Sequence, residues 1–140
     1  PAWEAEKAML MQKNIGATLN QIIREDDLKA MQQQVVETHV SDAILHYILN
    51  LVNESRQNPI YPNPLSPRAS RALLQGAKSW AFISGRDYVI PEDVQAIFIA
   101  VTAHRLASSQ SGSHATTPNS HLHNESLSQQ LLDSIDPIAA

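Results

Sequence analysis

Two helix start signals, separated by a glycine, constrain the fold of this chain most. Ser66-Pro67 predicts one helix start, because a serine oxygen can accept a hydrogen bond from a first-turn amide and proline needs no amide partner at the first helical position. Gly85 predicts the end of that helix, since glycine adopts a positive φ at little cost. Pro91-Glu92-Asp93 begins a second helix with acids in its first turn. We expect Tyr88-Val89-Ile90, between the two, to be extended.

Apolar residues at helical spacing predict the remaining elements. Ser41 is the expected N-cap of the strongest pattern, and weaker patterns predict helices over residues 3–13 and from Glu25 onward. The sequence therefore predicts an all-α domain of four to five helices with at most one short extended segment. The expected buried faces are Ile44, Leu45, Ile48, Leu49 and Val52; Ala69, Leu73, Ala77, Trp80 and Ala81; and Val94, Ile97, Phe98 and Val101.

Composition excludes several classes of protein. The 140 residues suit one domain with appendages, and the net charge of −4 argues against a nucleic-acid binder held by a basic surface. The longest apolar stretches are about half the length that a bilayer requires, so we expect no membrane helix. With no cysteine, disulfides, thiolate metal sites and cysteine nucleophiles are excluded. Because the chain begins at Pro1, we expect it to be cut from something longer.

The composition changes after residue 106. Residues 107–126 are mostly Ser, His, Thr, Asn and Gln, which predicts a flexible polar linker. Residues 127–140 regain apolar positions and predict one short C-terminal helix. The one cluster of histidines lies in this linker and consists of His114, His121 and His123. Because a flexible segment offers no preorganised ligand geometry, we expect no metal site there. His39, His46 and His104 fall at polar positions and should be solvated.

Arg68 is the candidate ligand-binding residue. It occupies the second position of a predicted helix, where a cation is unfavourable by about 0.3–1 kcal/mol unless an anion meets it. Arg71 follows one turn later, so both cations converge with the free amides on one point, which is how proteins bind phosphate. The alternative is an ordinary exposed arginine, because arginine is a good helix former. Arg86 and Asp87 are more simply interpreted as a turn with a local ion pair.

No motif for independent catalysis is present. The four glycines are isolated, so no loop can hold phosphates with its amides, and no Ser-His-acid set or paired carboxylates can be identified. We therefore expect this chain alone to have no catalytic residues and to be inactive as an enzyme.

With these residues in view, positions 1–106 resemble the C-terminal part of a MoxR-family AAA+ ATPase. The pieces are specific together, in this order and spacing. They are Pro1-x-x-x-Ala5-Glu6-Lys7-x-x-Leu10, Val40-Ser41-Asp42-x-x-x-x-Tyr47-Ile48, Leu65-Ser66-Pro67-Arg68-Ala69-Ser70-x-Ala72-Leu73-Leu74, Gly85-Arg86-Asp87-Tyr88-Val89-x-Pro91-Glu92-Asp93-Val94 and His104-Arg105-Leu106. One departure is Ile90, which stands where the family usually has a capping threonine, so that helix start could be frayed.

The resemblance implies a domain organisation and a site. Residues 1–25 would be a remnant of the nucleotide-binding core, 26–106 the helical AAA+ lid, 107–126 the flexible linker and 127–140 a short helix. It implies that Arg68 is the sensor-2 arginine, which contacts the γ-phosphate of ATP bound by the core; Arg71 is a weaker second candidate.

The resemblance also implies the properties of a longer parent protein. The parent would be a cytoplasmic ATP hydrolase that uses ATP and Mg²⁺ and forms a ring homo-oligomer. It would remodel or assemble partner proteins in a chaperone-like way, and such partners often carry von Willebrand factor A domains. The lid would associate with its own AAA+ core, with neither nucleic acid nor membrane as a partner.

One alternative from another class is a non-enzymatic helical adaptor or a histone-like dimerisation module. That module also places a long central helix before a short extended link and a Pro-Glu-Asp-Val helix start. It would dimerise through residues 36–52 and the helix at 67–84. A form that binds DNA would need a basic face, which the acidic balance of this chain disfavours.

Overall fold

The structure is a computed structural model that describes residues 3–11, 20–106 and 119–137. Apart from one isolated β-bridge, the regular elements of these residues are helices, which confirms the all-α prediction. The chain forms two compact units, Pro1–Met31 and Gln32–Ala140, and their boundary falls inside the second helix. The helices are α1 (Trp3–Met11), α2 (Glu25–Glu37), α3 (Asp42–Gln57), α4 (Pro67–Ile83), α5 (Pro91–Leu106) and α6 (Asn119–Asp133).

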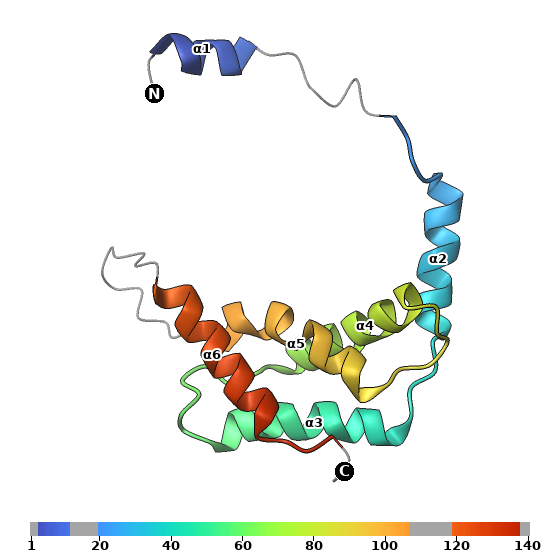
Figure 1. Cartoon of the computed structure of the whole chain (residues 1–140), viewed down its shortest axis with the longest axis vertical. Coiled ribbons are helices and arrows are strands. Elements are labelled where there is room, and N and C mark those ends of the chain that lie inside the picture. The colour runs from blue at the N-terminus through green and yellow to red at the C-terminus, as the bar shows by residue number, and fades with distance from the viewer. Residues whose placement is uncertain (1–2, 12–19, 107–118, 138–140) are drawn as a thin grey trace. The chain divides into compact units, whose positions relative to one another are not determined.

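The core of the second unit lies among α3, α4, α5 and α6 (Figure 1). Helix α5 packs along α4, and α6 crosses α5 and also contacts α3. Each of the four helices contributes a large side chain that is fully buried. These include Tyr47 and Leu51 from α3, Leu73 from α4, Phe98 from α5 and Leu131 from α6.

The predicted caps of α3 and α4 are confirmed. Ser41 Oγ accepts a hydrogen bond from the Ile44 amide at 3.4 Å, and Ser66 Oγ accepts one from the Ala69 amide at 3.3 Å. Gly85 follows the last turn of α4 with φ 75°, as predicted for a helix stop. Each helix therefore begins with a serine side chain that satisfies an otherwise unpaired amide.

The buried face of α3 differs from the prediction. Leu49 was expected in the core but is 55% exposed, and Leu45 is half-buried. The buried set has the 3-and-4 spacing of a single helix face, namely Ile44, Tyr47, Ile48, Leu51, Val52 and Ser55. The aliphatic residues alone predict a face that includes Leu49, whereas the buried face includes the aromatic Tyr47 instead. Trp80 of α4 is likewise 46% exposed, whereas the buried face of that helix consists of Ala69, Leu73, Ala77 and Ala81.

Helix α6 begins earlier than the composition predicted. Residues 119–126 were expected to belong to the polar linker, yet they are helical, and the helix ends at Asp133. Extending an existing helix by one residue costs far less free energy than forming its first turn. Once the last turns of α6 are packed against the core, the polar residues before them can therefore also be helical. Leu127 and Leu131 are buried, and Ser128 Oγ lies 3.1 Å from Thr102 Oγ1 of α5. Residues 107–118 and 138–140 lie outside the described residues.

The end of α2 is attached to the body at two places. Lys78 Nζ of α4 donates a hydrogen bond to the Val36 carbonyl at 2.7 Å. The backbone of His39 pairs with the loop between α4 and α5: its amide donates to Asp87 O at 2.7 Å, and its carbonyl accepts from the Val89 amide at 3.0 Å. The predicted extended segment therefore exists as a single parallel bridge between His39 and Tyr88. No local sequence pattern predicts His39 as the other side of this bridge.

Candidate functional site: the start of helix α4

Arg68 lies at the second position of α4 with an exposed side chain. Among the described residues, none forms an ion pair or hydrogen bond with its guanidinium, and the first turn of α4 contains no acid. The cation therefore adds to the partial positive charge of the helix start with no internal carboxylate to neutralise it. This arrangement suits an anion that approaches from outside the domain.

Arg71 lies one turn farther along α4 and is also exposed. Residues three apart on a helix lie on the same side, so Arg71 and Arg68 share one edge of α4. The Arg71 side chain also borders an apolar hollow between α3 and α4.

The residue before the cap of α4 is fixed by α3. Leu65 is buried, and its amide donates a hydrogen bond to Ser55 Oγ at 3.0 Å while its carbonyl accepts one from Arg56 Nε at 3.0 Å. The Ser55 hydroxyl in turn donates to the Val52 carbonyl at 2.6 Å. Both backbone groups of Leu65 are thus satisfied by consecutive residues of α3. Because Ser66 and Pro67 follow directly, the start of α4 and the base of Arg68 are held in one position.

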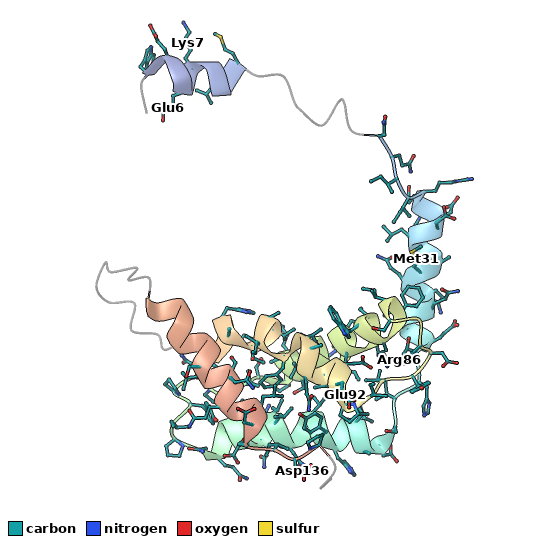
Figure 2. All side chains as sticks on the ribbon, in the orientation of Figure 1. Glu6, Lys7, Met31, Arg86, Glu92 and Asp136 are labelled. Atoms are coloured by element: carbon teal, nitrogen blue, oxygen red, sulfur yellow. The ribbon has the colours of Figure 1, made fainter. Side chains whose placement is uncertain are left out.

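The end of α4 is closed by backbone hydrogen bonds. The Gly85 amide donates to Phe82 O at 2.9 Å and the Arg86 amide donates to Ala81 O at 3.0 Å, the paired bonds of a Schellman motif. Arg86 completes this motif, and Figure 2 shows it beside the start of α5.

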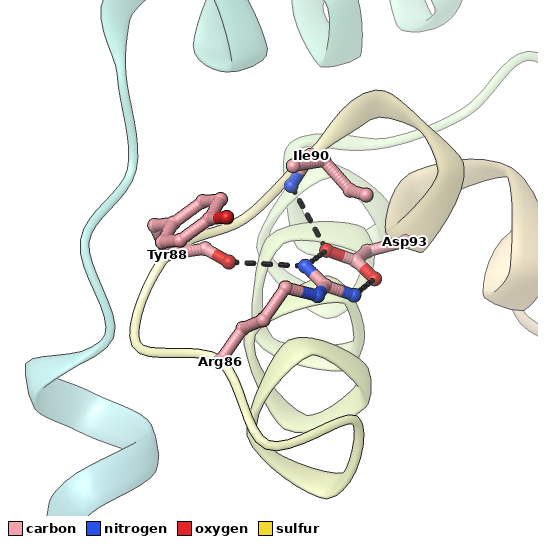
Figure 3. A network of polar contacts seen from close by, with 4 residues as sticks. All are labelled: Arg86, Tyr88, Ile90 and Asp93. Carbon is pink, nitrogen blue, oxygen red and sulfur yellow. Dashed lines mark hydrogen bonds and ion pairs between the residues drawn. The ribbon is translucent and has the colours of Figure 1, made fainter.

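Arg86 forms its ion pair with Asp93 rather than with Asp87, which corrects the sequence-based interpretation (Figure 3). Its Nη1 lies 2.7 Å from Asp93 Oδ2 and its Nη2 lies 2.5 Å from Oδ1, so the contact is bidentate. Asp93 Oδ2 also accepts the Ile90 amide at 2.9 Å. An acid at the third helical position can satisfy the amide of the N-cap residue, as in a capping box. Ile90 therefore does not leave the start of α5 uncapped, contrary to expectation.

The pKa of the Asp93 carboxyl lies below its ordinary value. Burial raises this pKa, since Asp93 is only 1% exposed, but the hydrogen bonds from Arg86 and from the Ile90 amide outweigh burial and lower it. The hydrogen bond to Asp93 raises the pKa of Arg86. Both groups are therefore charged at neutral pH. Arg86 is neutralised within the domain, whereas Arg68 is not.

The histidines add no site among the described residues. His39, His46 and His104 are exposed, as predicted. No group of His, Asp and Glu in the described part of the chain has an arrangement that could hold a metal ion. His114 and the side chains of His121 and His123 lie outside what the structure describes. In the described ranges, no helix is long and apolar enough to cross a membrane.

Comparison with known proteins identifies the class of this domain. The family model described as "AAA lid domain" matches residues 53–124, which is more than half of the chain. The chain therefore belongs to the AAA lid domain family, which the helical fold around α3, α4 and α5 also fits.

Its relatives narrow the class to the MoxR type. The chain is 30% identical over 116 residues to Chaperone MoxR1 of Mycobacterium tuberculosis, covering 76% of this chain and 31% of that protein. It is 31% identical over 83 residues to Protein MoxR of Paracoccus denitrificans, covering 49% of this chain and 24% of that protein. Uncharacterized protein YeaC of Bacillus subtilis is 36% identical over 89 residues, covering 64% and 28%. The domain is thus the lid of a MoxR-type AAA+ protein, as its motifs predicted.

A solved structure shows the same fold. The crystal structure of a candidate ATPase from Cytophaga hutchinsonii superposes with a TM-score of 0.67 at 20% identity, covering 96% of this chain and 43% of that one. The chain spans less than a third of the length of the curated relatives named above.

Proposed function

We propose that this domain is the lid of an ATP-hydrolysing parent protein and that Arg68 is its sensor-2 arginine, which contacts the γ-phosphate of bound ATP. The supporting observation is the exposed guanidinium at the fixed start of α4, without an acidic partner among the described residues. Its place in the matched motif Leu65-Ser66-Pro67-Arg68 supports the same role. Membership of the AAA lid family favours this role over a histone-like or adaptor module.

The proposed contact couples hydrolysis to movement of the lid. While the γ-phosphate is present, the Arg68 guanidinium gains a charge-assisted hydrogen bond in the closed arrangement. Hydrolysis and phosphate release remove that anion, so the closed arrangement loses its extra stability and the lid is free to rotate. Since Ser55 and Arg56 fix the start of α4, a shift at Arg68 would move the whole α3–α4 pair with it.

In this proposal the parent holds ATP and Mg²⁺ in its nucleotide-binding core, and the lid alone is inactive. The parent assembles as a ring and uses the lid movement to remodel or assemble other proteins, including partners with von Willebrand factor A domains. Chaperone MoxR1 carries a chaperone name, which supports such a role. The lack of cysteine in the chain fits a reducing compartment such as the cytoplasm.

Steady-state ATP hydrolysis by the parent tests the role of Arg68. We expect Arg68→Ala to lower the rate by about tenfold or more, because arginine contacts to a transferred phosphoryl group contribute several kcal/mol to catalysis. Arg71→Ala is the matched control on the same edge of α4 and should have a smaller effect. Arg68→Ala should raise the unfolding free energy of the 140-residue chain by at most about 1 kcal/mol, since no described residue pairs with this side chain and its charge is unfavourable at the helix start. Unchanged turnover in Arg68→Ala would exclude the proposed contact.

A further inference from the structure

Tyr47 carries a polar group that the packing of the domain leaves without a protein partner. The residue is fully buried in α3, and it belongs to the motif that begins at Val40. Among the described residues, none forms a hydrogen bond with its hydroxyl. A buried hydroxyl without a partner costs about fivefold to a hundredfold in the folding equilibrium constant, so most such groups in folded proteins are bonded to protein or to ordered water.

The surroundings of this hydroxyl are polar. Gln95 of α5 is half-buried beside it and makes a polar contact that falls short of hydrogen-bond geometry. Three carboxylates add negative charge nearby. They belong to Glu92 in the first turn of α5, Asp133 at the end of α6 and Asp136 just after it, and all three residues are exposed. The hydroxyl is therefore buried in a polar setting whose outer residues reach solvent.

The Tyr47 hydroxyl is a hydrogen-bond donor at neutral pH. Burial raises its pKa most, the Gln95 contact lowers it, and the three carboxylates raise it further. The group therefore keeps its proton and offers it to an acceptor. In the described part of the chain no carboxylate accepts that proton, and Asp133 Oδ1 instead accepts Gln129 Nε2 at 2.8 Å.

We propose that Tyr47, Gln95 and the end of α6 hold an ordered water molecule between them. Water fits because its oxygen accepts the Tyr47 proton while its own protons reach the Gln95 side-chain oxygen and a carboxylate of Asp133 or Asp136. The negative charge of these carboxylates favours that orientation. A metal ion fits less well, since no group of His, Asp and Glu in the described ranges is arranged to hold one.

The bound water fastens α6 to α3 and α5. A second buried polar contact joins α6 to α5, because Thr102 Oγ1 lies 3.1 Å from Ser128 Oγ. Asp133 lies more than one helical turn beyond Ser128, so the two contacts grip α6 at separate places. Apolar packing alone tolerates a helix that slides or turns about its axis, whereas either movement would leave these polar groups unsatisfied. The two contacts together therefore fix the register of α6 on the domain.

Tyr47→Phe tests the proposal through the sign of its effect, because it removes the hydroxyl and keeps the ring. With water bound, the variant loses a hydrogen bond, so the folding equilibrium constant of the 140-residue chain in urea unfolding should fall by about fivefold. If the hydroxyl has no partner, the variant removes a costly buried polar group and the constant should rise by a similar factor. An unchanged or increased constant therefore overturns the proposal.

Tyr88→Phe is the matched control. Tyr88 is 50% exposed, and phenylalanine keeps the ring that lies 5.9 Å from the Arg86 guanidinium. The folding equilibrium constant of this variant should change by less than about twofold, as for most exposed positions.

A crystal structure of the unchanged chain gives a measurement that does not depend on a variant. We expect solvent density about 2.8 Å from Tyr47 Oη and within hydrogen-bond reach of Gln95. A Gln95 side chain bonded directly to Oη, without such density, overturns the proposal. Stability that differs between potassium chloride and choline chloride in the unchanged chain, but not in Tyr47→Phe, assigns a cation to this place and also overturns it. None of these outcomes involves Arg68 or ATP, so each leaves the proposed function as it stands.

Discussion

Ser55 holds the start of α4, and its replacement by alanine should destabilise the domain. The hydroxyl donates to Val52 O within α3 and accepts the Leu65 amide, both at buried positions. In Ser55→Ala the Val52 carbonyl can keep its helical partner, but the Leu65 amide has no replacement acceptor. A buried donor without a partner costs about 1–3 kcal/mol. Alanine regains about 0.5 kcal/mol of helix propensity. The net loss is therefore about 1–2 kcal/mol.

Urea unfolding of the 140-residue chain, followed by its helical circular dichroism, measures this loss. With a slope of about 2 kcal/mol per molar urea for a domain of this size, the midpoint should fall by about 0.5–1 M. Ser79→Ala is a matched control, because Ser79 Oγ also donates to a carbonyl within its own helix, Gln75 O at 2.9 Å. In the part of the chain that the structure describes, that hydroxyl accepts no hydrogen bond from another element, so the control should be neutral or slightly stabilised.

The comparison of the two serine variants decides the reasoning. If Ser55→Ala unfolds at the same urea concentration as Ser79→Ala, then the Leu65 amide finds another partner and Ser55 does not fix the start of α4. In the parent, Ser55→Ala should also lower ATP turnover while Arg68 itself is intact, because the base of the guanidinium would no longer be held.

Two further variants test the loop between α4 and α5. The folded-state pKa of Asp93 is depressed, so the ionised carboxylate stabilises the fold above the ordinary carboxyl pKa, and this stabilisation is lost as pH falls through the lower folded value. In Asp93→Asn the unfolding free energy should therefore fall less steeply with decreasing pH than in the unchanged chain. An unchanged pH dependence would contradict the ion pair with Arg86. Gly85→Ala should destabilise the chain by about 1–2 kcal/mol in the same urea assay, because alanine is strained at φ 75°. Gly76→Ala, whose added methyl would lie 3.4 Å from Ile97, should show no such loss; equal effects of the two glycine variants would argue against strain at Gly85.

The sequence predicted those features that depend on local chemistry. Helix ends are such features: Ser41 and Ser66 accept a hydrogen bond from an amide of the turn that follows them, and Gly85 adopts a positive φ without strain. The structure confirms all three predicted ends. The family could also be predicted, since its motifs combine several such local signals. Both its position in the predicted helix and the family resemblance point to Arg68, and its role stays a prediction.

Features that depend on packing could not be predicted in the same way. The buried face of α3 includes Tyr47, which is fully buried near Gln95 of α5 and Asp133 of α6, and it leaves Leu49 exposed; residues adjacent in the sequence do not reveal these neighbours. The partner of Arg86 is seven residues away across a loop, so the adjacent Asp87 was the simpler choice. The early start of α6 depends on its contacts with α5, and composition alone favoured a linker.

Arg86 has a consequence for how the lid can vary in evolution. The Arg86 amide donates a closing hydrogen bond to α4, and its guanidinium binds the Asp93 carboxylate that caps α5. A single residue therefore fixes both the end of α4 and the start of α5. A substitution at the exposed Asp87 changes neither anchor, because Asp87 pairs with His39 through its backbone carbonyl. The Tyr88 ring, in contrast, lies 5.9 Å from the Arg86 guanidinium and helps to hold it in place. An inserted or deleted residue between 86 and 93 would separate the two anchors. Homologous lids should therefore differ freely in the residue at the position of Asp87 and hardly at all in the length of the turn.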